Sequence, residues 1–378
     1  MQPIATATAG KIAGTRQGNA PAPLSILDIA VTGRGHSASE ALAASIALAR
    51  LADRRGFHRY WVAEHHAMPG VATSSPPILL ARLISETKQI RLGAGGMMLP
   101  NFPPLVIAEQ FGLLEALAPD RIDLGLGRAP GTNGHTALAL RRGAIGAEDF
   151  PEQLQEILHF LADDFPADDP YHGRVFAVPG PGQDRANGLA RSSQRPSVWL
   201  LGSSGYSAVL AGQRGLPFAF AAQLAPENLA MAFALYRQHF QPSAVLDKPY
   251  AMVCLPVLAA EDENEAYQES RAFAHSMLRM MQQQSYLVPS PAEAEAYPYD
   301  AQELRTLEAW HSKTLFGTPE QVMAKLNHYQ ASVQADEVML VNVGHSPAAI
   351  HRSAELLADA YQLPDLTALA GEPSSSGR

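Results

Sequence analysis

The chain has 378 residues, of which 47% are hydrophobic and 17% are charged, so it is long and apolar enough to fold around a large core. A formal net charge of −9 argues against nucleic acid and anionic membrane surfaces as partners. The single cysteine, Cys254, excludes an intramolecular disulfide and a zinc site built on cysteines, and no apolar run reaches the roughly 18 residues of a membrane span.

The two ends of the chain differ in composition from the segment between them. Residues 1–23 are rich in Ala, Thr, Gly and Pro and lack the hydrophobic stretch of a signal peptide, so they predict a flexible leader. Residues 366–378 predict a flexible tail. We therefore expect one folded domain at 24–365 and, because a single cysteine fits a reducing compartment, a cytoplasmic location.

Eight strand-like runs follow one another in this domain, and each precedes helical sequence. The runs are 24–31, 60–63, 91–98, 122–126, 198–201, 217–221, 250–258 and 337–343. Strands that alternate with helices predict a parallel sheet, and eight repeats are what a TIM (β/α)8 barrel requires. An open doubly wound sheet is the alternative, but the candidate site residues follow several different strands, which favours the barrel.

Two long segments interrupt this alternation. Residues 163–197 are rich in Asp, Pro, Gly and Ser, and residues 285–316 are rich in Tyr, Pro and Glu. Segments of this length without periodicity are uncommon inside a compact domain and are often functional or mobile. We therefore predict irregular insertions at the C-terminal face of the barrel and consider both as candidates for a lid.

Acidic and imidazole side chains follow the second predicted strand. Glu64, His65 and His66 come directly after residues 60–63. Histidines at a strand end can perform acid–base chemistry or bind a metal, although adjacent side chains of an extended backbone point to opposite faces. A hydrogen-bonded polar turn without chemistry is the other interpretation.

Glycines lie at the ends of the third and fourth predicted strands. The run 125–131 does not match the dinucleotide-binding motif G-x-G-x-x-G, because its third glycine comes one residue late. Instead, Gly95, Gly96 and Gly127 allow a flat ligand to approach the backbone, and Arg128 offers a bidentate grip on phosphate or carboxylate. A surface ion pair is the alternative for Arg128.

Serines follow the fifth predicted strand, at the start of a predicted helix. Ser203, Ser204 and Tyr206 lie within the run 202–207. Free N–H groups at a helix N-terminus and serine hydroxyls together form an anion site. An ordinary serine N-cap is the alternative interpretation.

Taken in this order, these segments resemble the bacterial luciferase-like family of flavin-dependent monooxygenases. The resemblance extends over about residues 24–361. It is sharpest in residues 60–66 (Tyr-Trp-Val-Ala-Glu-His-His), 93–100 (Gly-Ala-Gly-Gly-Met-Met-Leu-Pro) and 121–128 (Arg-Ile-Asp-Leu-Gly-Leu-Gly-Arg). Residues 128–132 and 199–204 look like the single-chain oxidoreductase branch rather than a light-emitting luciferase subunit.

The resemblance implies a TIM barrel that binds FMN at its C-terminal face. By resemblance, Glu64 and His65 are catalytic residues beside the isoalloxazine ring. His65 matches the family histidine tied to stabilising a flavin intermediate or moving a proton. Gly95 and Gly96 match backbone positions under the ring, and Gly127 belongs to the ligand-facing end of the next strand.

The same resemblance assigns the phosphate end of the cofactor. Arg128 matches the phosphate-gripping arginine, and Ser203, Ser204 and Tyr206 fall where the family binds the phosphate and the ribityl chain. Gly202 is a departure, because luciferase-type subunits often have an acidic residue there.

The function that the resemblance implies is oxidation of a small organic substrate by reduced FMN and O2. The sequence shows no second nucleotide-binding domain, so we expect a separate flavin reductase, and by resemblance a homodimer. The alternatives are an F420-dependent dehydrogenase on the same barrel, a flavin-binding protein without turnover, and a metal-dependent hydrolase that uses His65 and His66. The substrate depends on loop shapes and is not predicted.

Overall fold

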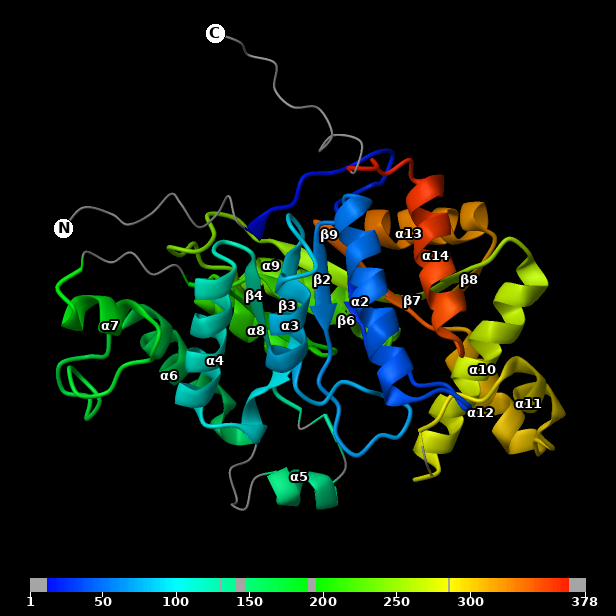
Figure 1. Cartoon of the computed structure of the whole chain (residues 1–378), viewed down its shortest axis with the longest axis horizontal. Coiled ribbons are helices and arrows are strands. Elements are labelled where there is room, and N and C mark those ends of the chain that lie inside the picture. The colour runs from blue at the N-terminus through cyan, green and yellow to red at the C-terminus, as the bar shows by residue number, and fades with distance from the viewer. Residues whose placement is uncertain are drawn as a thin grey trace, which may run out of the picture.

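The computed structural model describes residues 12–129, 131–132, 134–140, 147–189, 195–284 and 286–366, and its centre is a barrel of parallel strands (Figure 1). The barrel strands are β1 (Leu24–Asp28), β2 (Arg59–Val62), β3 (Arg91–Met98), β4 (Ile122–Gly127), β5 (Ser197–Gly202), β6 (Phe218–Ala221), β7 (Ala251–Ala259) and β9 (Glu337–Asn342). They pair in chain order, and β9 pairs with β1, which closes the ring. The predicted TIM barrel is confirmed, because each of the two edge strands of an open sheet would pair with only one neighbour.

Most helices pack on the outside of the barrel, and some pack on other helices. The helices are α2 (Ala38–Arg54), α3 (Pro76–Ile84), α4 (Pro104–Leu117), α5 (Gly134–Leu140), α6 (Phe150–Ala162), α7 (Pro181–Ala186), α8 (Gly205–Arg214), α9 (Leu229–His239), α10 (Glu263–Met281), α11 (Pro291–Ala296), α12 (Ala301–His311), α13 (Pro319–Val333) and α14 (Pro347–Ala360). Residues Leu99–Asn101, Ala147–Asp149 and Pro226–Asn228 form 3-10 turns. Many of the helices begin at proline, where a missing N–H is harmless. Across the described ranges, no helix combines the length and the apolar character needed to cross a membrane.

The second predicted insertion has regular structure. Residues 286–316 contain α11 and α12, and the short strand β8 (Leu315–Gly317) pairs with the end of β7. Both helices begin with a capping box, in which Ser290 pairs with Glu293 and Asp300 pairs with Glu303. These reciprocal side-chain bonds satisfy backbone N–H groups that a helix start leaves open, so short helices form without a long apolar repeat.

The first predicted insertion lies elsewhere, beside α4 and α6 (Figure 1). The N–H of Val178 donates to Glu109 of α4 at 3.4 Å. The ring of Phe165 packs on Phe160 of α6, with 4.8 Å between the ring centroids. Its only described helix is α7, so this segment extends the outer layer next to α6.

Part of the predicted leader packs against the barrel. Ile12 is fully buried, and the N–H of Asn19 donates to the backbone oxygen of Tyr361 at 2.8 Å, directly after α14. Residues 12–23 therefore contribute to the core. The predicted flexible ends also include residues 1–11 and 367–378, which lie outside the described residues.

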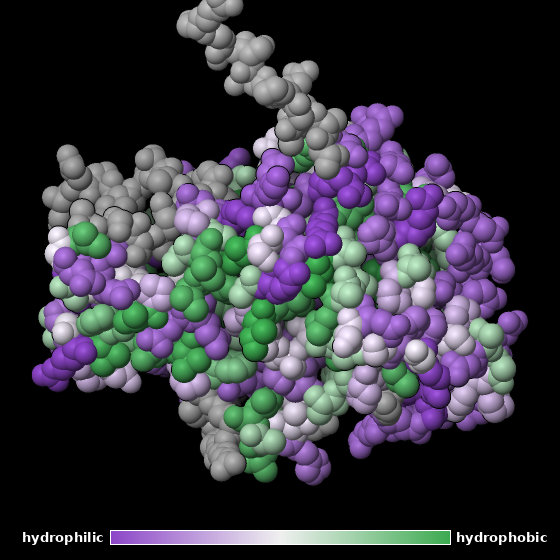
Figure 2. All heavy atoms as spheres, viewed as in Figure 1, coloured by the Kyte–Doolittle hydropathy of each residue, from purple (hydrophilic) through white to green (hydrophobic). Residues whose placement is uncertain are grey.

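The outer surface has an apolar face over α3 and α4 (Figure 2). Ile78 is 74% exposed, Leu113 is 55% exposed and Leu117 is 58% exposed. Exposed apolar side chains that gather in this way often mark an interaction surface.

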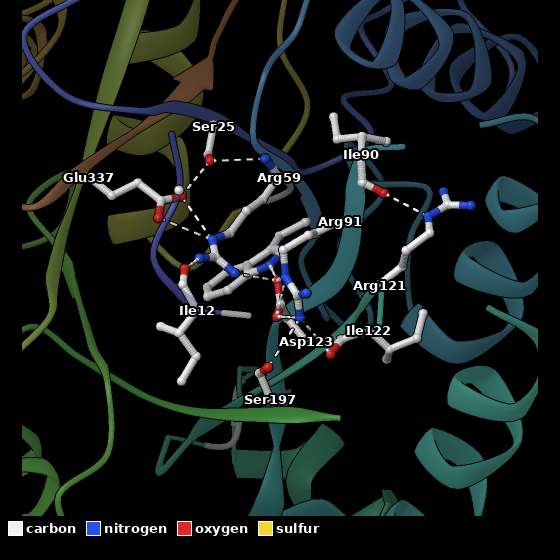
Figure 3. A network of polar contacts seen from close by, with 12 residues as sticks. Ile12, Ser25, Arg59, Ile90, Arg91, Arg121, Ile122, Asp123, Ser197 and Glu337 are labelled. Carbon is white, nitrogen blue, oxygen red and sulfur yellow. Dashed lines mark hydrogen bonds and ion pairs between the residues drawn. The ribbon is translucent and has the colours of Figure 1, made fainter. Parts of the chain in front are cut away.

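The amino-terminal end of the barrel is filled by a buried set of charges, Arg59, Arg91, Asp123 and Glu337, which we call the basal ion cluster (Figure 3). Arg59 donates to Asp123 (Nη1–Oδ2, 2.8 Å) and to Glu337 (Nε–Oε1, 2.9 Å). Arg91 donates to the other oxygen of Asp123 (Nη2–Oδ1, 2.6 Å), and Arg59 also donates to the backbone oxygen of Ile12. Burial raises the pKa of Asp123, but the two guanidinium groups lower it more, to about 2. Each buried charge therefore has a partner of opposite sign.

Candidate functional site: a cavity at the carboxyl end of the barrel

A cavity of about 390 Å³ opens at the carboxyl ends of the barrel strands. This volume is typical of small-molecule sites, which span about 300–1,000 Å³. Most of the predicted site residues line it, namely His65, Gly95, Gly96, Gly127, Arg128, Ser203 and Ser204. Motifs that are far apart in the sequence therefore meet in one place, because the carboxyl ends of parallel strands share one face of the barrel.

Glu64 is not among the residues that line the cavity. Its side chain is fully buried and accepts three hydrogen bonds, from Met98 N (3.0 Å), Asn101 Nδ2 (3.0 Å) and His66 Nε2 (2.8 Å). Burial raises the pKa of Glu64, and these hydrogen bonds offset part of that increase. Glu64 thus ties the end of β2 to the end of β3 and to His66.

His65 lies in the cavity wall and is half-buried. Its backbone N–H donates to Thr73 O at 3.1 Å, and its Nδ1 lies 3.4 Å from Gly131 O. Burial lowers the pKa of His65 below its ordinary value, which favours the neutral ring. With its proton on Nδ1 toward the carbonyl, the imidazole keeps Nε2 as a proton acceptor.

Gly95 and Gly96 lie where β3 shifts its register against β4, and the peptide bond between them is cis. A Cβ atom at Gly95 would lie 2.7 Å from Leu27 Cδ1 and 2.9 Å from Trp61 Cε3. A Cβ atom at Gly96 would lie 2.7 Å from Gly125 O. The barrel interior therefore has no room for a side chain at either position, and the backbone itself forms this part of the wall.

Arg128 follows β4 and has no carboxylate or hydrogen-bond partner within the described ranges. Its guanidinium carbon lies 4.2 Å from the centroid of the Tyr206 ring, which holds it by a cation–π contact. Tyr206 is 40% exposed and does not itself line the cavity. The surface ion pair considered for Arg128 is not found in this part of the chain, so its N–H donors are available to a ligand.

The amino terminus of α8 reaches the same place, because Tyr206 belongs to the first turn of that helix. Ser204 is the N-cap, yet its side chain makes no capping hydrogen bond to a described residue. By contrast, the N-cap Ser346 of α14 accepts a hydrogen bond from Ala349 N at 3.0 Å. Open helix N–H groups and the helix dipole favour a bound anion, so we call Arg128 and the first turn of α8 the candidate anion site.

A second part of the cavity wall combines residues of α10, which were not predicted, with Tyr286 and Trp310 of the segment 285–316 that was predicted at this face. We call it the apolar wall, and it consists of Phe273, Met277, Met280, Tyr286 and Trp310. An amphipathic helix such as α10 buries apolar residues whether they face a core or a cavity, so its pattern does not distinguish the two. The described residues of the first insertion, 163–189 and 195–197, line no part of this cavity.

His65 and His66, which were considered as metal ligands, and the single cysteine have other environments. Across the part of the chain that the structure describes, no group of three or more His, Cys, Asp or Glu side chains is placed to hold a metal ion. His66 pairs with Glu64. Cys254 is buried in β7, where burial raises the pKa of its thiol to about 12.

The fold and the cavity define a TIM-barrel protein with a small-molecule site at its C-terminal face. The family model for luciferase-like monooxygenases matches residues 24–335. A luciferase-like monooxygenase of Escherichia coli (strain K12) is 43% identical over 317 residues, which cover 84% of this chain and 90% of the relative. The N-acetyl-S-alkylcysteine monooxygenase of Bacillus subtilis (strain 168) is 33% identical over 345 residues, which cover 89% and 97%. The crystal structure of apo-MsnO8 matches with a TM-score of 0.78 and 34% identity, covering 91% of this chain and 98% of that one.

The chain belongs to the luciferase-like monooxygenase family, and it is a flavin-dependent monooxygenase. The predicted family and reaction class are thereby confirmed.

More distant matches differ from one another in cofactor. The oxygenase component of the flavin-dependent trigonelline monooxygenase of Acinetobacter baylyi is 22% identical over 80% of this chain and 83% of its own length. A Baeyer–Villiger monooxygenase in complex with FMN (TM-score 0.66, 19% identity, 90% and 98% covered) and an F420-dependent secondary alcohol dehydrogenase (TM-score 0.64, 14% identity, 90% and 99% covered) share the fold alone.

Proposed function

We propose that the protein oxidises a small organic substrate with O2 and reduced FMN, which it receives as a co-substrate. The observation that carries this proposal is Arg128, which has no anionic partner within the described ranges and lies beside the open amino terminus of α8. Free guanidinium donors next to helix N–H groups suit a phosphate monoester, and FMN ends in such a group.

The residues of the candidate anion site would hold the cofactor by its phosphate. Arg128, Ser203 and Ser204 would donate to the phosphate oxygens, and Tyr206 would keep the guanidinium in place. The glycines that end β3 and β4 would let the ring and the ribityl chain lie against the backbone.

When bound, reduced FMN supplies the two electrons that allow one atom of O2 to enter the substrate and the other to leave as water. We assign His65 the transfer of a proton at the reacting centre, because its neutral Nε2 is free to accept one. Glu64 is a positioning residue in this proposal, since its hydrogen bonds hold Met98 and His66. The apolar wall excludes water from the reacting groups.

The source of reduced flavin and the assembly are further parts of the proposal. The described residues form one barrel without a second nucleotide-binding domain, and a relative is an oxygenase component, so we propose a separate flavin reductase. The apolar face over α3 and α4 supports a homodimer. The Bacillus subtilis relative makes N-acetyl-S-alkylcysteines the first substrates to try. A cytoplasmic location stays a prediction.

Isotope labelling tests the proposal. The purified protein is mixed with chemically reduced FMN, ¹⁸O2 and N-acetyl-S-benzylcysteine, and the product is analysed by mass spectrometry. We expect one ¹⁸O atom in the product, dependent on both protein and substrate. Peroxide formation without product across a panel of thioethers and carbonyl compounds would contradict the proposal. Tighter binding of F420 than of FMN, with O2-independent turnover, would favour the dehydrogenase instead.

A further inference from the structure

Among the described residues that line the cavity, Lys313 is the only lysine. It follows α12, three residues after Trp310 of the apolar wall. The other permanently charged side chain in the described part of the lining is Arg128, which belongs to the candidate anion site at α8. An organic molecule that lies against the apolar wall therefore meets one positive charge that the candidate anion site does not use.

The contacts of Lys313 leave part of its binding capacity open. Its Nζ donates to Leu224 O at 3.0 Å and lies 4.0 Å from the centroid of the Trp310 ring. An ammonium group has three N–H donors, and the backbone bond uses one of them. Lys313 has no carboxylate partner within the described ranges. Its remaining donors are thus available beside an aromatic surface.

Gln223 supplies a second polar group to the same cavity. Its Oε1 is buried and accepts no hydrogen bond from any described residue. Gln223 directly precedes Leu224, whose carbonyl oxygen holds the Lys313 ammonium. A buried acceptor without a donor is unfavourable, so a ligand N–H or O–H that reaches it is favoured.

We propose that Lys313 binds the carboxylate of the substrate and that Gln223 accepts a hydrogen bond from an N–H or O–H near that carboxylate. The substrate class is therefore a carboxylic acid with an apolar body and a hydrogen-bond donor close to the acid group. This inference rests on the proposed monooxygenase function and adds the chemistry by which the substrate is selected.

A matched pair of ligands tests the assignment without turnover. N-acetyl-S-benzylcysteine and its primary amide share the apolar body and the N-acetyl N–H, but the amide carries an uncharged CONH2 group in place of the carboxylate. Their affinities for the protein saturated with oxidised FMN are measured by isothermal titration calorimetry. We expect the wild type to bind the acid at least about tenfold more tightly than the amide, because a hydrogen bond between charged groups strengthens binding by about that factor. Lys313→Met should reduce the ratio to about two, and Lys313→Arg should keep it.

Lys325 provides the control. Its Nζ also donates to a backbone oxygen, that of Phe316, at 2.7 Å, and lies 5.0 Å from an aromatic ring centroid, yet Lys325 does not line the cavity. Lys325→Met should therefore keep the preference for the acid. Gln223→Leu should weaken both ligands severalfold and leave their ratio unchanged, because the donor N–H is common to both.

Two results would overturn the inference. One is that the wild type binds acid and amide equally well or binds neither. The other is that Lys313→Met still prefers the acid. Loss of the preference in Lys325→Met overturns it as well. Selective binding of the acid without ¹⁸O incorporation would contradict the proposed function but would leave the role of Lys313 intact.

Discussion

The two ends of the barrel place arginine in opposite situations. Arg59, at the amino-terminal end, is fully buried and pairs with Asp123 and Glu337. Arg128, at the carboxyl end, contacts the ring of Tyr206 and has no anionic partner among the described residues. The first arrangement closes the barrel, whereas the second leaves a charge available in a cavity wall.

The difference follows from the cost of removing charges from water. A buried guanidinium is tolerated only with counter-charges and hydrogen bonds around it, so the basal ion cluster must be complete to be stable. A guanidinium at the edge of an open cavity keeps access to solvent until a ligand replaces it. Substitutions at the amino-terminal end should therefore change folding, and substitutions at the carboxyl end should change binding or rate.

The largest effect is expected from Asp123→Asn. This change leaves Arg59 and Arg91 buried with one counter-charge fewer, and we expect the free energy of unfolding to fall by about 3–5 kcal/mol. Urea denaturation measures this loss of stability. Glu86→Gln is the control, because Glu86 also contacts two arginines, Arg50 and Arg82, but on the surface. Equal destabilisation by both variants would remove the distinction between buried and exposed pairs.

Acid should weaken the same cluster. The folded-state pKa of Asp123 is about 2, below its ordinary value of 3.8. A lowered carboxyl pKa stabilises the fold above the unfolded pKa, and this contribution is lost as the pH falls from about 4 to about 2. The stability gap between the wild type and Asp123→Asn should therefore narrow over that interval. A constant gap down to pH 2 would be inconsistent with an ionised Asp123.

The next effect is expected at His65. Replacement by Asn should lower the rate of substrate oxidation about 100-fold or more while FMN affinity and stability stay unchanged, as is typical for loss of a proton-transfer group. Because burial lowers the pKa of His65, the acid limb of the wild-type rate profile should lie below pH 6.5. Stopped-flow measurements from pH 5 to 8 give both the oxidation rate and its pH profile. An unchanged rate and profile would rule out proton transfer by His65.

The smallest effect is expected at Ser204. Its hydroxyl caps no described N–H group of α8, so Ser204→Ala should leave stability unchanged and weaken FMN binding about two- to tenfold. Ser346 of α14 is the matched control, because its hydroxyl does cap the helix. Ser346→Ala should lower the free energy of unfolding by about 1 kcal/mol and leave FMN binding unchanged. Thermal unfolding and FMN titration measure these effects. If Ser204 were only a cap, Ser204→Ala would lower the stability and leave FMN binding unchanged.

Much of the barrel and the part of the cavity wall at the ends of β2 to β5 could be predicted from the sequence. Strand ends carry local signals, such as the imidazoles at 65–66 and the glycine followed by Arg128, and parallel pairing brings those ends together. These signals do not predict the direction in which a side chain points. Glu64 and His65 are neighbours, yet only His65 lines the cavity.

The segment 285–316, which contains Tyr286, Trp310 and Lys313, was predicted at this face, but no signal singled out these residues or those of α10. Their positions depend on how α10, α12 and the chain between them pack on the barrel, and helical periodicity does not report it. The capping pairs of Ser290 and Asp300 did mark α11 and α12, and they are the local feature from which those helices could have been found.

The most direct test of the flavin site compares FMN with riboflavin, which differ only in the phosphate. Both affinities are measured by calorimetry for the wild type, Arg128→Ala and Arg214→Ala, the last at the far end of α8. The assignment of Arg128 predicts that Arg128→Ala weakens FMN about 10- to 100-fold and riboflavin hardly at all, with Arg214→Ala like the wild type. Equal losses for both ligands, or no loss for FMN, would contradict it.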